Sequence, residues 1–359
     1  MKFLFNVCIT CIGGYLIRDI IDSLHDAHDF DVLIIGVDAN PSAHGRLLCD
    51  RFEVLPVAEE DEFGYIDSIL KIHEDIGIDV LITLSEGESR VVARYRDRLI
   101  DAGIRVSVSN SSTVEIMTDK LMMLQHMDKN HIDAGLFVPI NNNDDVKDAL
   151  KFLGYPEEKV VLKPRKSAGS RGVIIYDSYM SKVEYLLEER FCISGSFDDI
   201  EKELSNKGIV LANFIATPYY DGPVFDVECI AINGKVTDMA ARKRQLKNPL
   251  SPISTGHKVD MNSNVLAFAK KLCLVFNVNG SADFDIVLND IETPRLLDSG
   301  ARFSGSVGGS YIAGANFMAQ LVRVLMEVPY KPLEIRNNCI LRPFVSMSEI
   351  PKDNEKDFL

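Results

Sequence analysis

The sequence lacks features that define several common classes of protein. No run of about 18 apolar residues occurs in its 359 residues, so we expect no membrane-spanning helix and no membrane partner. The formal net charge is −14, which argues against a nucleic-acid partner because such proteins need a basic face. The apolar start of the chain, which carries only Lys2 before Arg18, fits a buried first strand better than a signal peptide.

Cysteines are few and scattered over the chain. There are seven, and Cys8 and Cys11 form a C-x-x-C pair without a second such pair to complete a metal site. An odd number of widely spaced cysteines is typical of reduced thiols. We therefore expect a cytoplasmic protein.

The first 110 residues alternate apolar strands with amphipathic helices. We expect strands at 3–9, 32–37, 52–57, 80–84 and 106–108, and helices at 15–25, 65–75 and 90–102. This alternation predicts an open parallel sheet with helices on both faces, whose ligands bind beyond the carboxyl ends of the strands. The loops there hold Gly13-Gly14, Asp38 and Glu86–Glu88. The two glutamates are candidates for binding a substrate amine, or are solvated loop carboxylates.

The rest of the chain changes its pattern. A helical region is expected at 111–135 and a charged helix at 179–206. Strands are then expected at 209–215, 224–233, 235–244, 282–288 and 295–297, with helices at 265–276 and 316–326. We find no internal repeat and no low-complexity segment.

Residues 160–173, VVLKPRKSAGSRGV, carry the clearest local signal. An apolar strand ends in Lys163, a small basic loop follows, and a second strand resumes at Val173. Gly169 and Gly172 permit positive φ, and successive amides in such a turn bind anions. The segment is a phosphate-binding lid or an ordinary basic hairpin. It is not a P-loop, in which the lysine follows the glycines and a helix comes next.

Acidic residues mark two neighbouring strands further along. Asp283 and Asp285 share one face of the strand 282–288 because side chains alternate along a strand. The turn after it should bring Asp298 beside Asp285. Paired carboxylates with open positions suit Mg²⁺, which takes its remaining ligands from water and phosphate; the alternative is a hairpin with solvated acids.

Two arginines form a third candidate cluster. Arg242 and Arg244 lie on one face of the strand 235–244, and alternating arginines can bind phosphate or carboxylate bidentately. A solvated edge strand is the alternative. His257 follows in a loop and is left without a role. Lysine lid, arginines and acids together supply the positioning and charge neutralisation that phosphoryl transfer needs.

With these motifs the sequence resembles the ATP-grasp superfamily, especially the carboxylate–amine ligases similar to the large subunit of carbamoyl phosphate synthetase. The resemblance implies a mixed α/β and α+β fold, in which a Rossmann-like parallel sheet precedes a two-subdomain ATP-grasp fold. It implies a pre-ATP-grasp domain at 1–115, ATP-grasp subdomains at 116–206 and 207–345, and a flexible tail at 346–359.

The resemblance also assigns roles to residues. Lys120 and Lys163 match the two ATP lysines, and Asp285 and Asp298 match the metal ligands. Arg242 and Arg302 are the expected catalytic residues, which face the acyl phosphate. The remaining expected nucleotide contacts are Ser167, Gly169, Ser170 and Gly172 in the lid, Ala212, Asn213 and Phe214 in the hinge strand, Glu228, and Arg244. The implied cofactors are ATP and Mg²⁺, with Mn²⁺ as a substitute.

The sequence departs from the family signature Glu-x-Asn-Pro-Arg. It reads Asp298-Ser299-Gly300-Ala301-Arg302, so an aspartate replaces the glutamate and Gly300 replaces a metal-binding asparagine. Some amino-acid ligases of the family also lack that asparagine, which leaves one or two metal ions open. The acidic hinge residue of many members is absent too.

These residues predict an ATP-dependent ligase. A small-molecule carboxylate would be phosphorylated to an acyl phosphate, and an amine or thiol would attack it with release of ADP and phosphate. One alternative is an ATP-binding regulatory or assembly protein with decayed ligase chemistry. Another is a synthetase that uses ammonia or bicarbonate. A homodimer is the default expectation for assembly.

Overall fold

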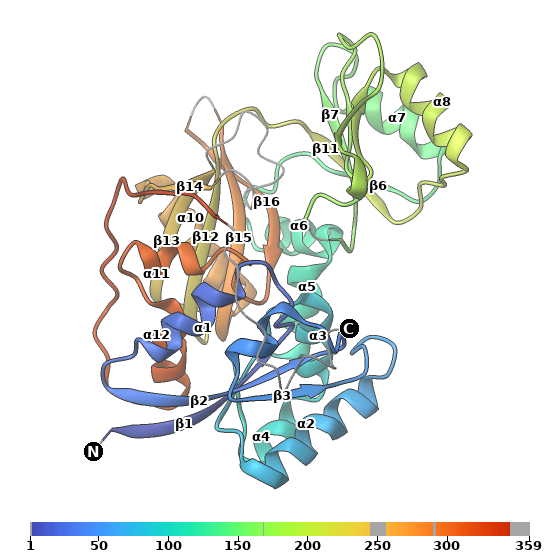
Figure 1. Cartoon of the computed structure of the whole chain (residues 1–359). Coiled ribbons are helices and arrows are strands. Elements are labelled where there is room, and N and C mark those ends of the chain that lie inside the picture. Colours follow the sequence, from blue (N-terminus) through green and yellow to red (C-terminus); the bar gives the residue numbers. More distant parts are fainter. Residues whose placement is uncertain (1, 168, 245–255, 290–291, 345–359) are drawn as a thin grey trace.

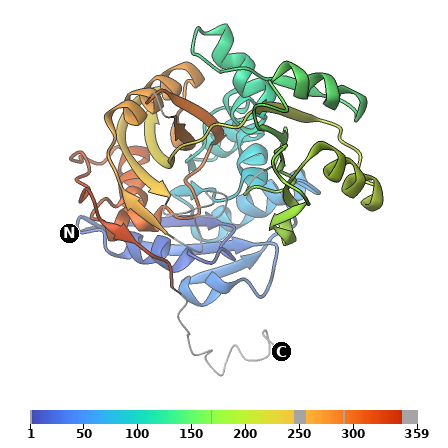
Figure 2. The same cartoon turned by 90° about the horizontal axis from the view of Figure 1, so that it is seen from above.

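The computed structural model describes residues 2–167, 169–244, 256–289 and 292–344. Three β-sheets account for the architecture, one of five strands and two of six. The second sheet and its helices form a lobe that stands apart from the other two sheets (Figures 1 and 2). The predicted tail at 346–359 lies outside the described residues. Within the described part of the chain, no helix has the length and apolar character needed to cross a membrane.

The N-terminal sheet is parallel, as predicted, with the strand order β3-β2-β1-β4-β5. Its strands are β1 (Phe3–Thr10), β2 (Phe30–Asp38), β3 (Arg51–Val54), β4 (Val80–Ile82) and β5 (Arg105–Val106). Its helices are α1 (Ile17–His25), η1 (His44–Leu48), α2 (Glu62–Ile76), α3 (Glu86–Arg94) and α4 (Arg96–Asp101). The helix expected at 90–102 is thus two helices that meet at Tyr95.

Alternation along β1 assigns its side chains to two cores. Phe5, Val7 and Ile9 are buried with α1 and α12 (Phe317–Leu325) on one face. Cys8 is buried on the other face among residues of α2, α3 and α5 (Ser111–Thr118). The first strand is therefore covered on both sides, which is why its sequence is almost continuously apolar.

The second sheet has the strand order β6-β11-β7-β8-β10-β9. Its elements are β6 (Val138–Ile140), α7 (Asp144–Phe152), β7 (Val160–Pro164), β8 (Ile174–Tyr176), β9 (Glu184–Leu187), η2 (Glu188–Arg190), β10 (Cys192–Gly195), α8 (Phe197–Lys207) and β11 (Phe214–Pro218). The helix predicted over 179–206 is wrong in its first half. There the chain forms the antiparallel pair β9 and β10, and Phe191 between them takes a left-handed conformation that ends any helix.

The third sheet has the order β16-β15-β12-β13-β14-β17. Its strands are β12 (Val224–Ile232), β13 (Lys235–Arg244), β14 (His257–Val259), β15 (Gly280–Leu288), β16 (Pro294–Gly300) and β17 (Ile340–Leu341). The helix α10 (Ser263–Phe276) packs on one face, where Phe225, Val227 and Phe284 are buried. The opposite face carries Asp226 and Asp285, so the period of two separates the core from the charged residues.

Two further helices connect the sheets. α5 and α6 (Lys120–Lys129) lie between the N-terminal sheet and the second sheet, and their apolar residues join the core beneath α10. The helix α11 (Gly308–Ile312) follows the third sheet's strand β16 in the chain and packs against α1 of the N-terminal domain. Close approach is essential there, because a Cβ on Gly308 would lie 2.4 Å from the Cβ of Asp19.

Substitution of Gly308 should therefore destabilise the fold. Gly308→Ala is expected to force α11 away from α1 and to lower the free energy of unfolding by about 1–3 kcal/mol, the range for overpacked sites. Gly305→Ala, in the loop before α11, is the matched control, since a Cβ there meets nothing within 4 Å. Urea titration of both variants gives the comparison, and equal stability of the two would contradict the packing argument.

Candidate active site

A cavity of about 540 Å³ lies where the three sheets converge. The N-terminal sheet contributes residues from the loops after β1 and β4, including Cys11 and Glu86. The second sheet contributes Lys163 and Tyr219, and the third contributes Asp285 among others. Most of the residues expected to act on ATP therefore line one space, although they are spread over almost 200 positions of the sequence.

Two lysines enter this cavity from different elements. Lys120 begins α6 and is almost fully buried; its Nζ donates to the carbonyl oxygen of Ser167 at 2.6 Å and lies 3.1 Å from Oδ1 of Asp298. Lys163, on β7, places its Nζ 3.4 Å from the carbonyl oxygen of Leu297. Each lysine thus bridges from its own element to β16 of the third sheet.

The charge of Lys163 is sensitive to its surroundings. Burial lowers the pKa of this lysine to about 8, Asp298 opposes that shift and the nearby Lys120 adds to it. The ammonium form of Lys163 is therefore in balance with the neutral amine near physiological pH. An anionic ligand in the cavity would favour the ammonium form.

Asp119 fixes the position of Lys120 in the chain. Its carboxylate caps α6 by accepting from the amides of Leu121 and Met122, and it also binds Arg165 through two hydrogen bonds of 3.0 and 2.8 Å. Although burial raises the pKa of Asp119, the bonds from Arg165 and the amides lower it overall. The cap thus links the start of α6 to the end of β7.

The predicted lid is the turn between β7 and β8. Ser167, Gly169 and Ser170 line the cavity, whereas Gly172 does not. Gly169 and Gly172 have φ of 65° and 72°, which agrees with the expected need for glycine. Arg190 holds the turn, because its Nη1 donates to the carbonyl oxygen of Gly169 and its carbonyl oxygen accepts from the amide of Gly172. Ala168 lies outside the described residues.

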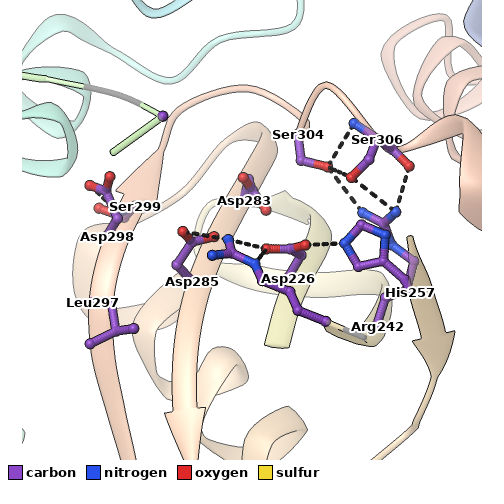
Figure 3. Close-up of polar contacts among 12 residues, drawn as sticks. Asp226, Arg242, His257, Asp283, Asp285, Leu297, Asp298, Ser299, Ser304 and Ser306 are labelled. Carbon is purple, nitrogen blue, oxygen red and sulfur yellow. Dashed lines mark hydrogen bonds and ion pairs between the residues drawn. The ribbon is translucent and has the colours of Figure 1, made fainter. Parts of the chain in front are cut away.

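The acids on β15 and β16 meet as predicted. Asp285 is directly opposite Asp298 in the antiparallel register (Figure 3). Asp283 is opposite Gly300 in the same register. Asp226 on β12 continues the row, since it faces Asp285 on the other side. Sequence reasoning missed Asp226, although its alternation with Glu228 in the strand 224–232 was a usable signal.

Arg244 compensates the charge of this row. It contacts Asp226, and its Nη2 lies 2.6 Å from Oδ2 of Asp285. Burial nevertheless raises the pKa of Asp285 to about 7, since repulsion from Asp226 and Asp298 adds to the effect of burial and Arg244 opposes it. Asp226 is also buried, but Arg244 and His257 keep its pKa well below the usual range. The cavity therefore holds carboxylates of different basicity.

The donor set at Asp285 and Asp298 fits a magnesium ion. Both offer carboxylate oxygens on adjacent strands, and Oδ1 of the neighbouring Asp283 is buried without a hydrogen-bond partner. Within the described ranges, no group of three histidine, cysteine or acidic side chains forms a complete metal cage. Mg²⁺ commonly binds through one or two carboxylates together with substrate phosphates, so these residues match its preference.

Arg302 joins the third sheet to the N-terminal domain. Its Nη2 lies 3.0 Å from Oε1 of Glu86, and its Nη1 lies 3.4 Å from Oδ2 of Asp283. Burial raises the pKa of Glu86, an effect that Arg302 counteracts. Of the loop residues singled out in the sequence, Glu86 therefore reaches this cavity, whereas Asp38 accepts a hydrogen bond from the amide of Gly13.

Arg242 and Glu228 are placed differently from the expectation. Neither lines the cavity and both side chains are fully buried, where they form an ion pair with each other. Arg242 also donates to Ser304 at 3.0 Å and to Oγ of Ser306 at 3.1 Å. Its guanidinium is thus saturated by the chain itself (Figure 3), so the expectation that Arg242 faces the phosphates is wrong in this structure.

The hinge residues also lie outside the cavity lining. The carbonyl oxygen of Asn213 accepts the amide of Arg165, and Phe214 pairs with Pro164 and Ile140 in the sheet. Ala212 precedes them at the surface. The cavity instead reaches the end of the same strand, at Thr217 and Pro218, and the next residue, Tyr219.

Breaking the buried pair should affect stability strongly. Arg242→Leu leaves Glu228 as an unpaired buried charge, a change that typically costs roughly 3–5 kcal/mol. The double variant Arg242→Leu/Glu228→Leu should recover part of this loss because no isolated charge remains. Chemical denaturation of the three proteins measures the difference, and a double variant less stable than Arg242→Leu would refute the interpretation.

Comparisons with known proteins agree with this geometry. Residues 211–343 match the family described as ATP-grasp in the biosynthetic pathway with Ter operon. The matched segment contains the third sheet with its acids and arginines. No curated protein matches the sequence significantly.

Solved structures resemble nearly the whole chain. An L-amino acid ligase from Bacillus licheniformis has a TM-score of 0.63 at 16% identity, over 90% of this chain and 75% of that chain. N5-carboxyaminoimidazole synthetase from Staphylococcus aureus, complexed with ADP, has a TM-score of 0.67 at 12% identity, over 94% and 81%. Biotin carboxylase from Campylobacter jejuni has a TM-score of 0.62 at 12% identity, over 92% and 73%. The family match over residues 211–343 and the shared fold agree with the predicted resemblance to the ATP-grasp superfamily, and the chain has the fold of these ligases.

Proposed function

We propose that the protein is an ATP- and Mg²⁺-dependent ligase that joins a carboxylate to an amine or thiol through an acyl phosphate, with release of ADP and phosphate. One observation carries this proposal: Lys120, Lys163, the glycine-containing lid and the Asp285–Asp298 pair all border one cavity. A nucleotide complex of a structural neighbour, the synthetase with ADP, supports the same conclusion.

The lysines and the lid would bind the phosphates. Lys120 and Lys163 bring two positive charges to one side of the cavity, and the turn that contains Gly169 and Ser170 also lines it. Successive backbone amides in such a turn can bind anions. Neutralisation of the triphosphate is the main requirement of phosphoryl transfer. Asp285 and Asp298 would hold Mg²⁺, which supplies charge neutralisation and orientation of the phosphates when bound.

Arg302 is the proposed catalytic residue for the carboxylate. It is held by Glu86 and Asp283 at the edge of the cavity, where a fixed guanidinium stabilises charge on a forming acyl phosphate. Arg242 would act indirectly, by positioning the loop that follows Arg302 through its hydrogen bonds to Ser304 and Ser306. We keep Ala212–Phe214 as the proposed adenine contact, together with Thr217–Tyr219 at the end of β11.

The predicted domain boundaries belong to the same proposal. The lobe that carries Lys163 and the lid would close over ATP held against the third sheet. β11 lies beyond the predicted boundary at 207 but pairs with β6 and β7 of that lobe. The segment 219–223 between β11 and β12 is therefore the proposed hinge.

A regulatory ATP-binding protein is the second candidate. Gly300 stands where the family signature has asparagine, and the described part of the chain contains no complete metal cage. Such a protein would bind ATP without releasing ADP in the presence of any acid and amine. The two candidates therefore differ in turnover and agree in nucleotide binding.

An ADP-release screen tests the ligase. Purified protein with MgATP is expected to release ADP with some pair from a panel of amino acids and small carboxylates. Lys163→Ala should lower that rate by roughly 100-fold or more, as loss of one preorganised charge does in other enzymes. Lys151→Ala, an exposed lysine on α7 of the same lobe, is the control and should keep full activity.

If calorimetry detects no Mg²⁺-dependent ATP binding, both candidates fail. ATP binding without ADP release across the panel favours the regulatory protein. Equal activity of Lys163→Ala and Lys151→Ala would remove the lid lysine from the mechanism.

ATP affinity should also depend on pH through Lys163. The pKa of Lys163 is lowered to about 8, so above pH 8 the lysine of the free protein is mostly neutral. It must then take up a proton before it can bind phosphate as a charged group. The affinity should then fall by about tenfold per pH unit above pH 8 and stay nearly constant between pH 7 and 8. Calorimetric titrations from pH 7 to 9.5 measure this profile.

Lys163→Arg is the matched variant for the pH experiment. Arginine stays charged throughout this range, so its profile should be flat above pH 8 even if its absolute affinity is lower. A decline that persists in Lys163→Arg would assign the pH dependence to another group.

A further inference from the structure

A second cavity, of about 840 Å³, lies beside the first. It is bounded by the β1–α1 loop and η1 of the N-terminal domain, by α11, and by β14 and β17 at the edge of the third sheet. Ser306 lines both cavities, so they adjoin at the loop that Arg242 holds. The proposed ATP site therefore has a neighbouring pocket of a size that small-molecule ligands use.

The inner wall of this pocket is polar and buried. His257 and Ser306 are 3% and 7% exposed, and Arg242 is inaccessible. Arg242 is saturated by Glu228, Ser304 and Ser306. Among the described residues of this inner wall, the remaining group that could bind a ligand is Nδ1 of the His257 ring.

The orientation of His257 is fixed by Asp226. Nε2 of the ring lies on Oδ2 of Asp226 (Figure 3), and no other partner of the ring occurs in the described ranges. Since Asp226 is ionised, Nε2 carries the hydrogen and Nδ1 on the opposite side of the ring is an acceptor. Burial and Arg242 lower the pKa of His257, which keeps Nδ1 unprotonated.

The outer wall combines apolar surface with positive charge. Ile17, Leu47 and Ile312 contribute aliphatic side chains. This part of the lining contains three basic residues, Arg18, His44 and Arg342, and one acidic residue, Asp19. Tyr15 stacks on His44 with ring centroids 5.8 Å apart and extends the apolar surface. This wall suits a ligand with an apolar body and an anionic group.

We propose that the second cavity binds the amine substrate of the ligase, as an apolar amine that carries a carboxylate. The amine would donate to Nδ1 of His257, its body would pack against Ile17, Leu47 and Ile312, and its carboxylate would face Arg342. The adjoining loop at Ser306 places that amine beside the cavity in which the acyl phosphate would form. This inference rests on the proposed function, because it names one of its substrates.

Calorimetric titration of the full chain tests the site, with and without Mg²⁺ and a non-hydrolysable ATP analogue. The probes are phenylalanine, leucine and glutamate, with phenylalaninamide and 3-phenylpropionate as analogues that lack the carboxylate or the amine. Phenylalanine or leucine should bind at least about tenfold more tightly than glutamate, whose charged side chain cannot pack on the aliphatic wall. Each phenylalanine analogue should bind more weakly than phenylalanine.

Two variants of the site and one control separate it from the rest of the protein. Leu47→Glu should weaken phenylalanine binding at least about tenfold by adding a negative charge to the wall. Leu274→Glu, at an exposed leucine of α10, is the matched control and should leave it unchanged. His257→Gln keeps a donor for Asp226 but no acceptor at Nδ1. It should weaken phenylalanine by about fivefold to tenfold, the value of one hydrogen bond, and leave 3-phenylpropionate unaffected.

The outcomes distinguish this inference from the proposed function. ATP binding without binding of any amino acid probe would overturn the inference and leave the ligase standing. Amino acid binding without ATP binding would overturn the proposed ligase function and leave the second cavity as an amino acid site. Phenylalanine binding that persists in Leu47→Glu would place the amino acid elsewhere, and equal loss of phenylalanine and 3-phenylpropionate in His257→Gln would show that His257 has only a structural role.

Discussion

Three carboxylates stand in one row across the third sheet, and the rest of the site depends on how their charge is balanced. Asp298, Asp285 and Asp226 are direct neighbours on β16, β15 and β12. Like charges opposite each other destabilise a sheet, and burial makes the repulsion stronger. The row is stable only because partners reach it at both ends: the ammonium of Lys120 at its β16 end, and the guanidinium of Arg244 with the neutral ring of His257 at its β12 end.

This balance also joins the third sheet to α6 and to the N-terminal domain. Lys120 extends from α6 to Asp298, and Arg302 extends from the third sheet to Glu86 at the start of α3. Removal of Arg302 would leave the mostly buried carboxylate of Glu86 without its partner, which is more costly than loss of an exposed ion pair. The same pairs keep the cavity ready for phosphate and metal, because a ligand can replace the partners of existing charges without creating new ones.

Arg242 and Arg244 show how the same face of one strand can serve two purposes. The two arginines are two residues apart on β13, yet Arg244 lines the first cavity and Arg242 forms the inner wall of the second. Arg242 binds Glu228, which lies diagonally across from it in the sheet, and its remaining N–H groups donate to Ser304 and Ser306. The charged face of the sheet therefore separates two pockets, which adjoin at the loop of Ser304 and Ser306 (the serine loop).

The sequence by itself determined the elements and much of the site. Alternation predicted the parallel sheet, the shared face of Asp283 and Asp285, and the pairing of Asp285 with Asp298, because period-two patterns and short turns are local properties. The positive φ of Gly169 and Gly172 followed from the composition of the lid. Only the tertiary structure decided which charged residues meet. Arg242 and Arg244 are equivalent in the strand pattern, and the alternation of Asp226 with Glu228 marks a charged face without saying which partners that face meets. Their partners come from β12, the serine loop and β14, so their roles follow from contacts between segments far apart in the sequence.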